Sequence, residues 1–290
     1  MAPEAADPHA HPPSTPPGGP APRGAPRGPL QKMDKGRIRR IVAVGSGKGG
    51  VGKSSTTVLL ASEMQRRGFR VGILDADVTG PSVPKLLGSS GPLRDQGEGI
   101  EPAHSSGGML LISSQFLVED DQTPVIWRGP LVTRLIQQFF GGVNWGALDY
   151  LFIDMPPGTS DIPLTVFQTI PIDGMVFVFT PQELAGMIVR KAMNMARDVH
   201  VPLLGVVENM TVVTCPHCHT EFEPFGPSRV DAVATEYGVP VLAKLPLDPA
   251  VSERGDAGKL DVWESAPIRQ LATSLDAALV AVEKSRGATL

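Results

Sequence analysis

Cysteine, excess charge and long apolar runs are all scarce in this chain. Its 290 residues contain only two cysteines, Cys215 and Cys218. In such a chain a single pair of cysteines indicates metal binding or catalysis rather than a structural disulfide. No run of about eighteen apolar residues occurs, so we expect no membrane-spanning segment. The net charge of −4 gives no electrostatic reason to expect a nucleic-acid partner.

The first residues lack the features of a targeting segment. MAPEAADPHAHPPSTPP has acids and prolines where a signal peptide needs a basic and then an apolar stretch. It also lacks the Arg-rich, acid-poor pattern of a mitochondrial transit peptide. We therefore expect a cytoplasmic protein.

Large aliphatic residues are almost absent from the N-terminal segment. Residues 1–30 hold 10 of the 29 prolines, and their only large aliphatic residue is Leu30. Such a segment cannot bury enough apolar surface to offset the entropy lost on ordering. We predict a disordered Pro/Gly-rich tail over residues 1–37 and a folded domain over residues 38–290.

Strand-like and helix-like stretches alternate from residue 38 onward. Apolar runs predict strands at 40–44, 70–77, 149–156, 174–181, 202–209 and 240–246. Helical spacing appears at 53–68, 131–140, 182–199, 227–238 and 266–284. Residues 79–125 are richer in Gly, Ser and Pro, so we expect one or two short strands there. The alternation predicts an α/β fold with a doubly wound, mostly parallel sheet and helices on both faces.

The stretch VAVGSGKGGVGKSS, residues 42–55, contains a phosphate-binding pattern. Gly47 to Ser54 satisfy G-x-x-x-x-G-K-[ST] between an apolar strand and a helix, as the P-loop motif requires. The glycines let backbone N–H groups turn toward phosphate oxygens, and the helix N-terminus adds its positive dipole end. Lys53 is expected to neutralise the outer phosphates and the Ser54 hydroxyl to bind Mg²⁺.

Carboxylates follow two of the predicted strands. Asp75 and Asp77 end the second strand, and Asp154 ends a later one. Side chains at strand ends face the ligand crevice of a doubly wound sheet. Asp154 stands where a Walker B aspartate holds Mg²⁺, and the PPGTSD loop after it is placed to sense a γ-phosphate.

The cysteine pair in TCPHCHT leaves several chemistries open. A tetrahedral metal or an iron–sulfur cluster usually takes four ligands, so two thiols are an incomplete set. CPHCH also matches the haem-attachment pattern, which requires export, and the thioredoxin C-x-x-C belongs to a different fold. Zinc remains an alternative, held with His217 or His219 or shared between two chains, and so does a purely structural thiol pair.

Lys48 is a second lysine inside the phosphate loop. GKGGVGKS is a deviant Walker A motif, and with it the sequence resembles the ATPase class of MinD, ParA and the nitrogenase iron protein. The resemblance implies that Lys48 reaches the partner's nucleotide across a dimer, as an arginine finger does. DADVTGPSVP, WRGP, DMPPGTSD, TPQELA, and VVENM followed by CPHC narrow the match. From about residue 38 onward the chain resembles the Mrp/ApbC family of iron–sulfur carrier ATPases.

This resemblance implies a nucleotide site shared by two copies of the chain. ATP would lie in a homodimer and be hydrolysed slowly, with Asn209 recognising adenine and Asp77 positioning the attacking water. Lys48, Asp77 and Asp154 are the implied catalytic residues, and Ser54 and Asp154 the implied Mg²⁺ ligands. The implied nucleotide-binding set is Gly47, Lys48, Gly49, Gly50, Val51, Gly52, Lys53, Ser54, Ser55 and Asn209.

The resemblance also implies the cargo. Cys215 and Cys218, in a loop at about residues 210–225, would bind a bridging [4Fe–4S] cluster at the dimer interface. A cluster donor and client apoproteins would be the partners. The chain departs from the family at His219 and Ser160, where glycine is usual, and in PFGPSR, where a Gly-rich stretch is expected. Two alternative functions remain: a MinD/ParA-like positioning or partitioning switch, and a zinc-stapled regulatory ATPase.

Overall fold

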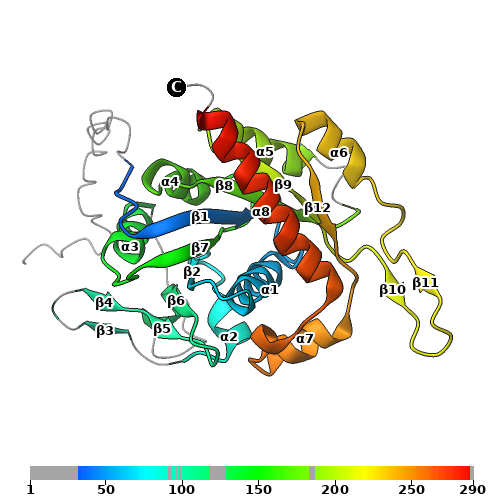
Figure 1. Ribbon diagram of the computed structural model, residues 1–290, viewed down its shortest axis with the longest axis horizontal. Helices are drawn as coiled ribbons and strands as arrows, with labels where there is room; N and C mark the ends of the chain where they lie inside the picture. The colour runs from blue at the N-terminus through cyan, green and yellow to red at the C-terminus, as the bar shows by residue number, and fades with distance from the viewer. Residues whose placement is uncertain are drawn as a thin grey trace, which may run out of the picture. The chain divides into compact units, whose positions relative to one another are not determined.

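One sheet forms the centre of the protein. The computed structural model describes residues 32–90, 93–95, 97, 99–117, 129–182 and 187–287. Among these residues, eight strands form a sheet in the order β12-β9-β8-β1-β7-β2-β6-β5 (Figure 1). Its parallel strands are β1 (Ile38–Gly45), β2 (Val71–Asp75), β6 (Leu110–Ser113), β7 (Leu148–Asp154), β8 (Gly174–Phe179), β9 (Leu203–Glu208) and β12 (Val241–Lys244). The edge strand β5 (Ala103–His104) is antiparallel to β6. The predicted doubly wound α/β fold is confirmed.

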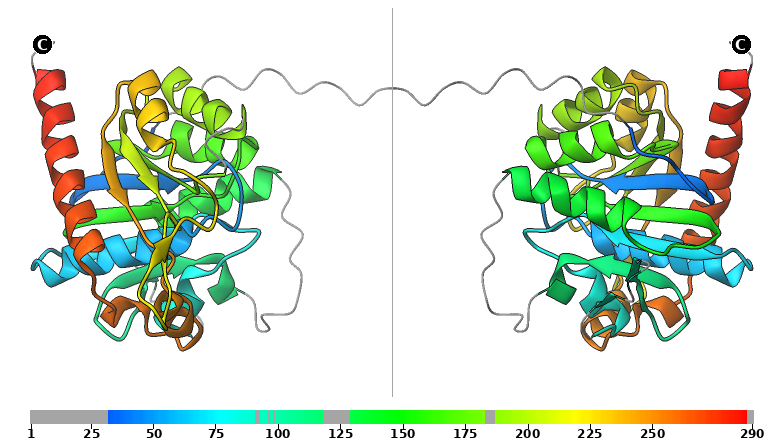
Figure 2. Two further views of the ribbon diagram at one scale, coloured as in Figure 1. Left: turned by 90° about the vertical axis from the view of Figure 1, so that its right-hand side faces the viewer. Right: turned by 90° about the vertical axis from the view of Figure 1, so that its left-hand side faces the viewer.

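Helices cover both faces of the sheet (Figure 2). One apolar core joins the sheet to α3 (Gly129–Gly141), α4 (Asp161–Thr169), α5 (Met187–Asp198) and α6 (Val230–Tyr237). A second core, on the other face, joins it to α1 (Lys53–Arg66), α2 (Val83–Leu87), α7 (Pro249–Asp256), the 3-10 turn η2 (Leu260–Val262) and α8 (Ala266–Gly287). The strand β1 shows why its sequence is apolar throughout: Ile41 and Ala43 enter the first core, Val42 and Val44 the second.

The region between β2 and α3 is more regular than its composition predicts. The prediction of one or two short strands in 79–125 is wrong, because the described part holds β3 (Arg94–Asp95), β4 (Ile100–Glu101), β5 and β6, besides α2 and the 3-10 turn η1 (Ser114–Leu117). The first three of these strands have two residues each, too few for an alternating pattern to show. Residues 118–128, including the WR of WRGP, lie outside the described residues.

Residues 32–37, which the sequence analysis places in the tail, contact the domain. The Met33 N–H donates to Thr169 O at 2.8 Å, and the Met33 side chain packs against the first core. Lys35 forms an ion pair with Asp173. The scarcity of large aliphatic residues is a property of residues 1–30, and Met33 and Lys35 lie beyond that segment. Residues 1–31 lie outside the described residues.

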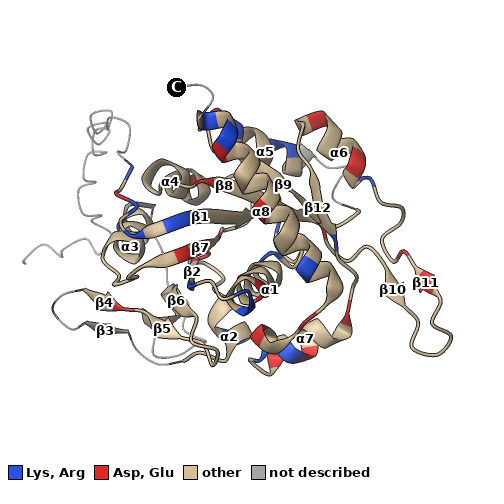
Figure 3. Cartoon of the chain, viewed as in Figure 1, with Lys and Arg blue, Asp and Glu red and all other residues tan. Residues whose placement is uncertain are grey.

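Basic and acidic residues are mixed on the surface helices (Figure 3). Residues of both signs lie side by side on α7 and α8 (Figure 3). Within the described ranges, no helix is long and apolar enough to cross a membrane.

Candidate functional site

The phosphate loop joins β1 to α1 and depends on its glycines. Gly50 and Gly52 both have φ near 81°, a left-handed backbone that favours glycine. A Cβ on Gly52 would also lie 2.2 Å from Asn209 Nδ2, so any other residue there would have to displace the Asn209 side chain. Ser46 Oγ donates to Lys48 O at 2.8 Å and fixes the start of the loop. The loop therefore ends at the N-terminus of α1, where backbone N–H groups are available for an anion.

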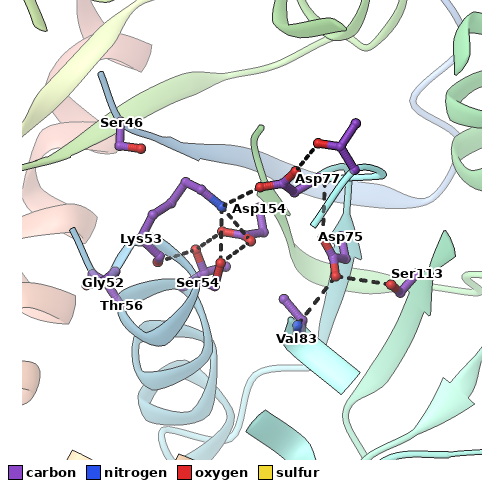
Figure 4. A network of polar contacts seen from close by, with 12 residues as sticks. Ser46, Gly52, Lys53, Ser54, Thr56, Asp75, Asp77, Val83, Ser113 and Asp154 are labelled. Carbon is purple, nitrogen blue, oxygen red and sulfur yellow. Dashed lines mark hydrogen bonds and ion pairs between the residues drawn. The ribbon is translucent and has the colours of Figure 1, made fainter. Parts of the chain in front are cut away.

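Lys53, Ser54 and Asp154 form a bonded cluster behind the loop (Figure 4). Lys53 is 6% exposed, and its Nζ lies 2.7 Å from Asp154 Oδ2 and 3.1 Å from Ser54 Oγ. Ser54 Oγ donates to Asp154 Oδ2 at 2.6 Å. A hydroxyl and a carboxylate oxygen side by side suit Mg²⁺, which prefers oxygen ligands. The residues predicted for Mg²⁺ thus lie together.

Thr57 belongs to this cluster and was missed by the sequence analysis. Its Oγ1 donates to Asp154 Oδ1 at 2.9 Å, which satisfies the second oxygen of that fully buried carboxylate. Thr57 lies one helical turn after Lys53, so the spacing alone placed both on one face of α1. The motifs indicated that Asp154 lies near Ser54, but none of them indicated the bond from Thr57 to its second oxygen.

Asp75 is a buried carboxyl that holds the loop carrying Asp77. It pairs in register with Asp154 on the neighbouring strand β7. Its oxygens accept from the Asp77 N–H at 3.2 Å and the Ser113 hydroxyl at 3.0 Å, with the Val83 N–H at 3.4 Å. Complete burial and the nearby Asp154 charge raise the pKa of Asp75 to about 8.

Asp77 lies at the mouth of the same cluster. Its Oδ2 is 3.9 Å from Lys53 Nζ, and its Oδ1 accepts from Thr79 Oγ1 at 3.1 Å. Burial raises the pKa of Asp77, although the Lys53 charge acts in the opposite direction. Three carboxyl groups therefore lie near one buried ammonium, and burial together with their mutual repulsion favours a proton on Asp75.

A cavity of about 320 Å³ opens beside the phosphate loop. Its wall begins at Gly52 and Ser55, continues through Asn209 and Met210, and includes the segment Leu245–Asp248. Asn209 Nδ2 donates to Val51 O at 2.9 Å, so this side chain fastens the cavity wall to the loop. The volume suits a small-molecule site, and the contact with Gly52 makes it continuous with the phosphate loop.

The cysteines lie on an antiparallel hairpin of β10 (Val213–Thr214) and β11 (Glu221–Phe222), at the margin of the domain (Figure 1). The Cys215 N–H donates to Thr220 O, and the His219 N–H donates to Cys215 O. Cys218 is exposed, and Thr220, first through its hydroxyl and then through its backbone, lowers the pKa of the Cys218 thiol. The hairpin thus presents a thiolate-prone sulfur to solvent.

His219 has φ 55°, in the left-handed region. Glycine adopts this conformation most readily, and histidine is among the other residues that tolerate it best. Of the other departures, Ser160 is the exposed N-cap of α4 without a side-chain cap bond, and Ser228 of PFGPSR donates to Glu208.

For two of the remaining predicted features, Lys48 and the TPQELA segment, the structure gives less detail. Lys48 is exposed on the phosphate loop. Residues 183–185 of TPQELA lie outside the described residues. Where side chains are described, no group of three His, Cys, Asp or Glu is arranged to hold a metal ion, so the intrachain zinc set with His217 or His219 is not assembled.

Comparisons with known proteins agree with this geometry. A family model described as "NUBPL iron-transfer P-loop NTPase" matches residues 37–281. An "Iron-sulfur cluster carrier protein" of Methanocaldococcus jannaschii is 44% identical over 77% of this chain and 77% of that protein. A protein of the same name from Aquifex aeolicus is 42% identical over 77% of this chain, which spans only 61% of the length of that relative.

A solved structure shares the architecture as well as the sequence. The nucleotide-binding protein of Archaeoglobus fulgidus in complex with ADP is 40% identical, with a TM-score of 0.70, over 79% of this chain and 90% of that one. The phosphate loop, the carboxylates at the strand ends and the matched family model lead to one conclusion: the chain belongs to the NUBPL iron-transfer P-loop NTPase family.

Proposed function

We propose that this protein is an ATP-dependent carrier of iron–sulfur clusters that works as a homodimer. The observation that carries the proposal is the exposed Cys215–Cys218 hairpin on the same domain as a P-loop with a bonded Lys53–Ser54–Asp154 cluster. The name "Iron-sulfur cluster carrier protein" of the relatives supports the same cargo.

The nucleotide would bind along the phosphate loop and the cavity beside it. The phosphates would lie against the loop Gly47–Gly52 and the start of α1, and the adenine beside Asn209, because the cavity wall runs from Gly52 to that residue. Lys53 would exchange Asp154 for phosphate oxygens. Ser54 and Asp154 would hold Mg²⁺, which neutralises phosphate charge when bound.

Two further residues would support a slow hydrolysis. Asp77 is placed at the mouth of the carboxylate cluster, where its carboxyl can orient water. Its raised pKa makes it a better proton acceptor than an ordinary aspartate. Lys48, exposed on the loop, would act on the nucleotide of the partner chain.

The cluster is cargo, and one chain supplies half of its ligands. A [4Fe–4S] cluster is normally held by four thiolates, and each chain offers two. A second copy related by a two-fold axis would supply the others through the same surface. A donor would load this site, and apoproteins would receive the cluster from it.

Anaerobic reconstitution tests the proposal. We expect about four irons and four sulfides per dimer on size-exclusion chromatography with metal analysis. Cys215→Ser and Cys218→Ser should each abolish the cluster and leave ATP binding intact, whereas His217→Ala should retain both. A full cluster on a monomer, or a dimer that holds only zinc, would contradict the proposal.

A further inference from the structure

A buried carboxylate at the end of β9 has no role in the site described so far. Glu208 is fully buried, and its Oε2 accepts from Ser228 Oγ at 2.6 Å. Its Oε1 is also buried and has no hydrogen-bond partner among the described residues. Burying a carboxylate is costly unless its oxygens are satisfied, so a half-satisfied one requires an explanation.

Glu208 is connected to two residues that line the cavity, Asn209 and Leu245. The next residue, Asn209, lines the cavity and donates to Val51 O in the phosphate loop. Glu208 O accepts from the Leu245 N–H at 2.8 Å, and Leu245 begins the segment that forms another part of the cavity wall. A molecule that displaces either wall segment therefore displaces the backbone of Glu208.

The cysteine hairpin is attached to the cavity wall by both of its legs. The outgoing leg is the segment that leads from β9 into β10, and the return leg is the segment that leads from β11 to α6. The outgoing leg is held by its backbone: the Thr211 N–H donates to Leu245 O at 3.0 Å, and Val212 O accepts from the Leu247 N–H at 2.8 Å. The return leg runs from β11 to Ser228 just before α6, and there its hydroxyl bonds to Glu208. Among the described contacts, the outgoing leg is thus held by two backbone bonds, and the return leg is held at Ser228 by one side-chain bond.

We propose that Glu208 is a positioning residue through which a nucleotide in the cavity sets the position of the cysteine hairpin. This inference rests on the proposed function. The two carboxylate oxygens give Ser228 two acceptors within one buried group, one used and one open. A shift of the β9 end on nucleotide binding moves Ser228 from one oxygen toward the other. The return leg then swings about the outgoing leg and changes the exposure of Cys218. This hydrogen bond has two possible arrangements, and occupation of the cavity favours one of them. An element of that kind can couple two sites.

Alkylation of the cysteines reports this movement. The full-length, reduced, cluster-free protein is treated with iodoacetamide, and the labelling rate of Cys218 is followed by mass spectrometry with and without Mg·ATP. ATP affinity is measured in parallel by calorimetry. In the unmodified protein we expect Mg·ATP to change the rate by about fivefold or more, the lower end of coupling between linked sites. Ser228→Ala should bring the ratio of the two rates to about one. Ser228→Thr, which keeps the hydroxyl, should retain the ratio.

Two further variants separate coupling from folding. Glu208→Gln keeps a single oxygen acceptor, so it should hold the return leg in one arrangement and also bring the ratio to about one. Ser274→Ala on α8 removes an exposed serine hydroxyl elsewhere and should leave the ratio unchanged. Thermal melts and size-exclusion chromatography with Mg·ATP are used to check that the variants keep the fold and the oligomeric state of the unmodified protein.

The outcomes distinguish this inference from the proposed function. If ATP binds to the unmodified protein and the labelling rate does not change, or if Ser228→Ala keeps the full ratio, the link through Glu208 is wrong and the proposed function stands. If ATP does not bind at all, the proposed function fails and this inference fails with it.

Discussion

At the scale of single residues, the site is a balance between three carboxyl groups and one lysine. Lys53 lies 2.7 Å from Asp154 and 3.9 Å from Asp77, and it is the buried cation next to them. Asp75 lies behind them, with a raised pKa because it is buried beside Asp154. The two loop lysines are therefore expected to differ in role, since Lys53 is buried in this cluster and Lys48 is exposed.

We expect Lys53→Ala and Lys48→Ala to separate binding from turnover. Lys53→Ala removes the charge that would face the phosphates of its own chain, so ATP binding should fall by about a hundredfold or more. Lys48→Ala should change affinity by less than about threefold and lower hydrolysis by at least roughly tenfold, because its proposed target is the nucleotide of the other chain. Calorimetry and phosphate release measure the two effects. Equal losses of affinity in both variants would refute the role of Lys48 across the dimer.

The raised pKa of Asp75 predicts a pH dependence of stability. A carboxyl whose pKa is about 8 in the folded protein and about 4 in the unfolded chain stabilises the fold fully below pH 4. That contribution is lost as the pH rises from about 4 to 8, because folding then opposes ionisation. Asp75→Asn cannot ionise, so the decline in melting temperature between pH 5 and pH 8 should become smaller.

Asp149→Asn is the matched control for that experiment. Its backbone bond from Arg70 lowers the pKa of Asp149, so the group is ionised in both states throughout pH 5–8. Its replacement should leave the slope of melting temperature against pH unchanged. An unchanged slope in Asp75→Asn as well would show that Asp75 keeps an ordinary pKa.

At the scale of elements, the cysteine hairpin is a short turn whose geometry depends on His219. A left-handed residue other than glycine costs about 1–2 kcal/mol, and histidine bears this cost here at φ 55°. The turn is closed by the Cys215–Thr220 and His219–Cys215 backbone bonds. The stability of these two bonds therefore depends on how well residue 219 adopts the left-handed backbone.

We expect His219→Gly to tighten the hairpin and His219→Val to loosen it. Glycine adopts the left-handed backbone freely, so amide protection at Cys215 and His219 should rise by a few-fold with glycine and fall with valine. Hydrogen exchange with mass spectrometry on the 213–222 segment measures this. His217→Gly, at a position without positive φ, should lower the protection instead. Higher protection in His217→Gly than in His219→Gly would count against the conformational argument.

At the scale of the whole molecule, the boundary of the folded domain lies before β1. Met33 packs on the first core and bonds to Thr169, and Lys35 pairs with Asp173. These contacts tie residues 32–37 to α4 and to the start of β8, although the segment has no regular structure of its own.

Two deletions test this boundary. Removal of residues 1–31 should leave the melting temperature nearly unchanged, since residues 1–30 offer almost no apolar surface. Removal of residues 1–37 should lower it by roughly 2–4 °C for each kcal/mol by which Met33 and Lys35 stabilise the fold. Scanning calorimetry of the two truncated proteins gives the comparison. A drop on the first deletion equal to that on the second would place the boundary elsewhere.

The sequence by itself determined the sheet, the phosphate loop and the carboxylates at the strand ends. These features depend on local patterns: β1 is apolar because both of its faces are buried, and the glycines of the loop are required by φ values of single residues. Asp75, Asp77 and Asp154 were found because a strand end in a parallel sheet has a known direction.

Only the tertiary structure decided how these parts meet. Thr57 beside Asp154, the cavity between Gly52 and Leu245–Asp248, and the Glu208–Ser228 bond join residues separated along the chain by 20 to 196 positions. The raised pKa of Asp75 likewise arises from burial beside another strand. No pattern within one segment contains these contacts, because packing across the sheet sets which side chains meet and which charges lose their water.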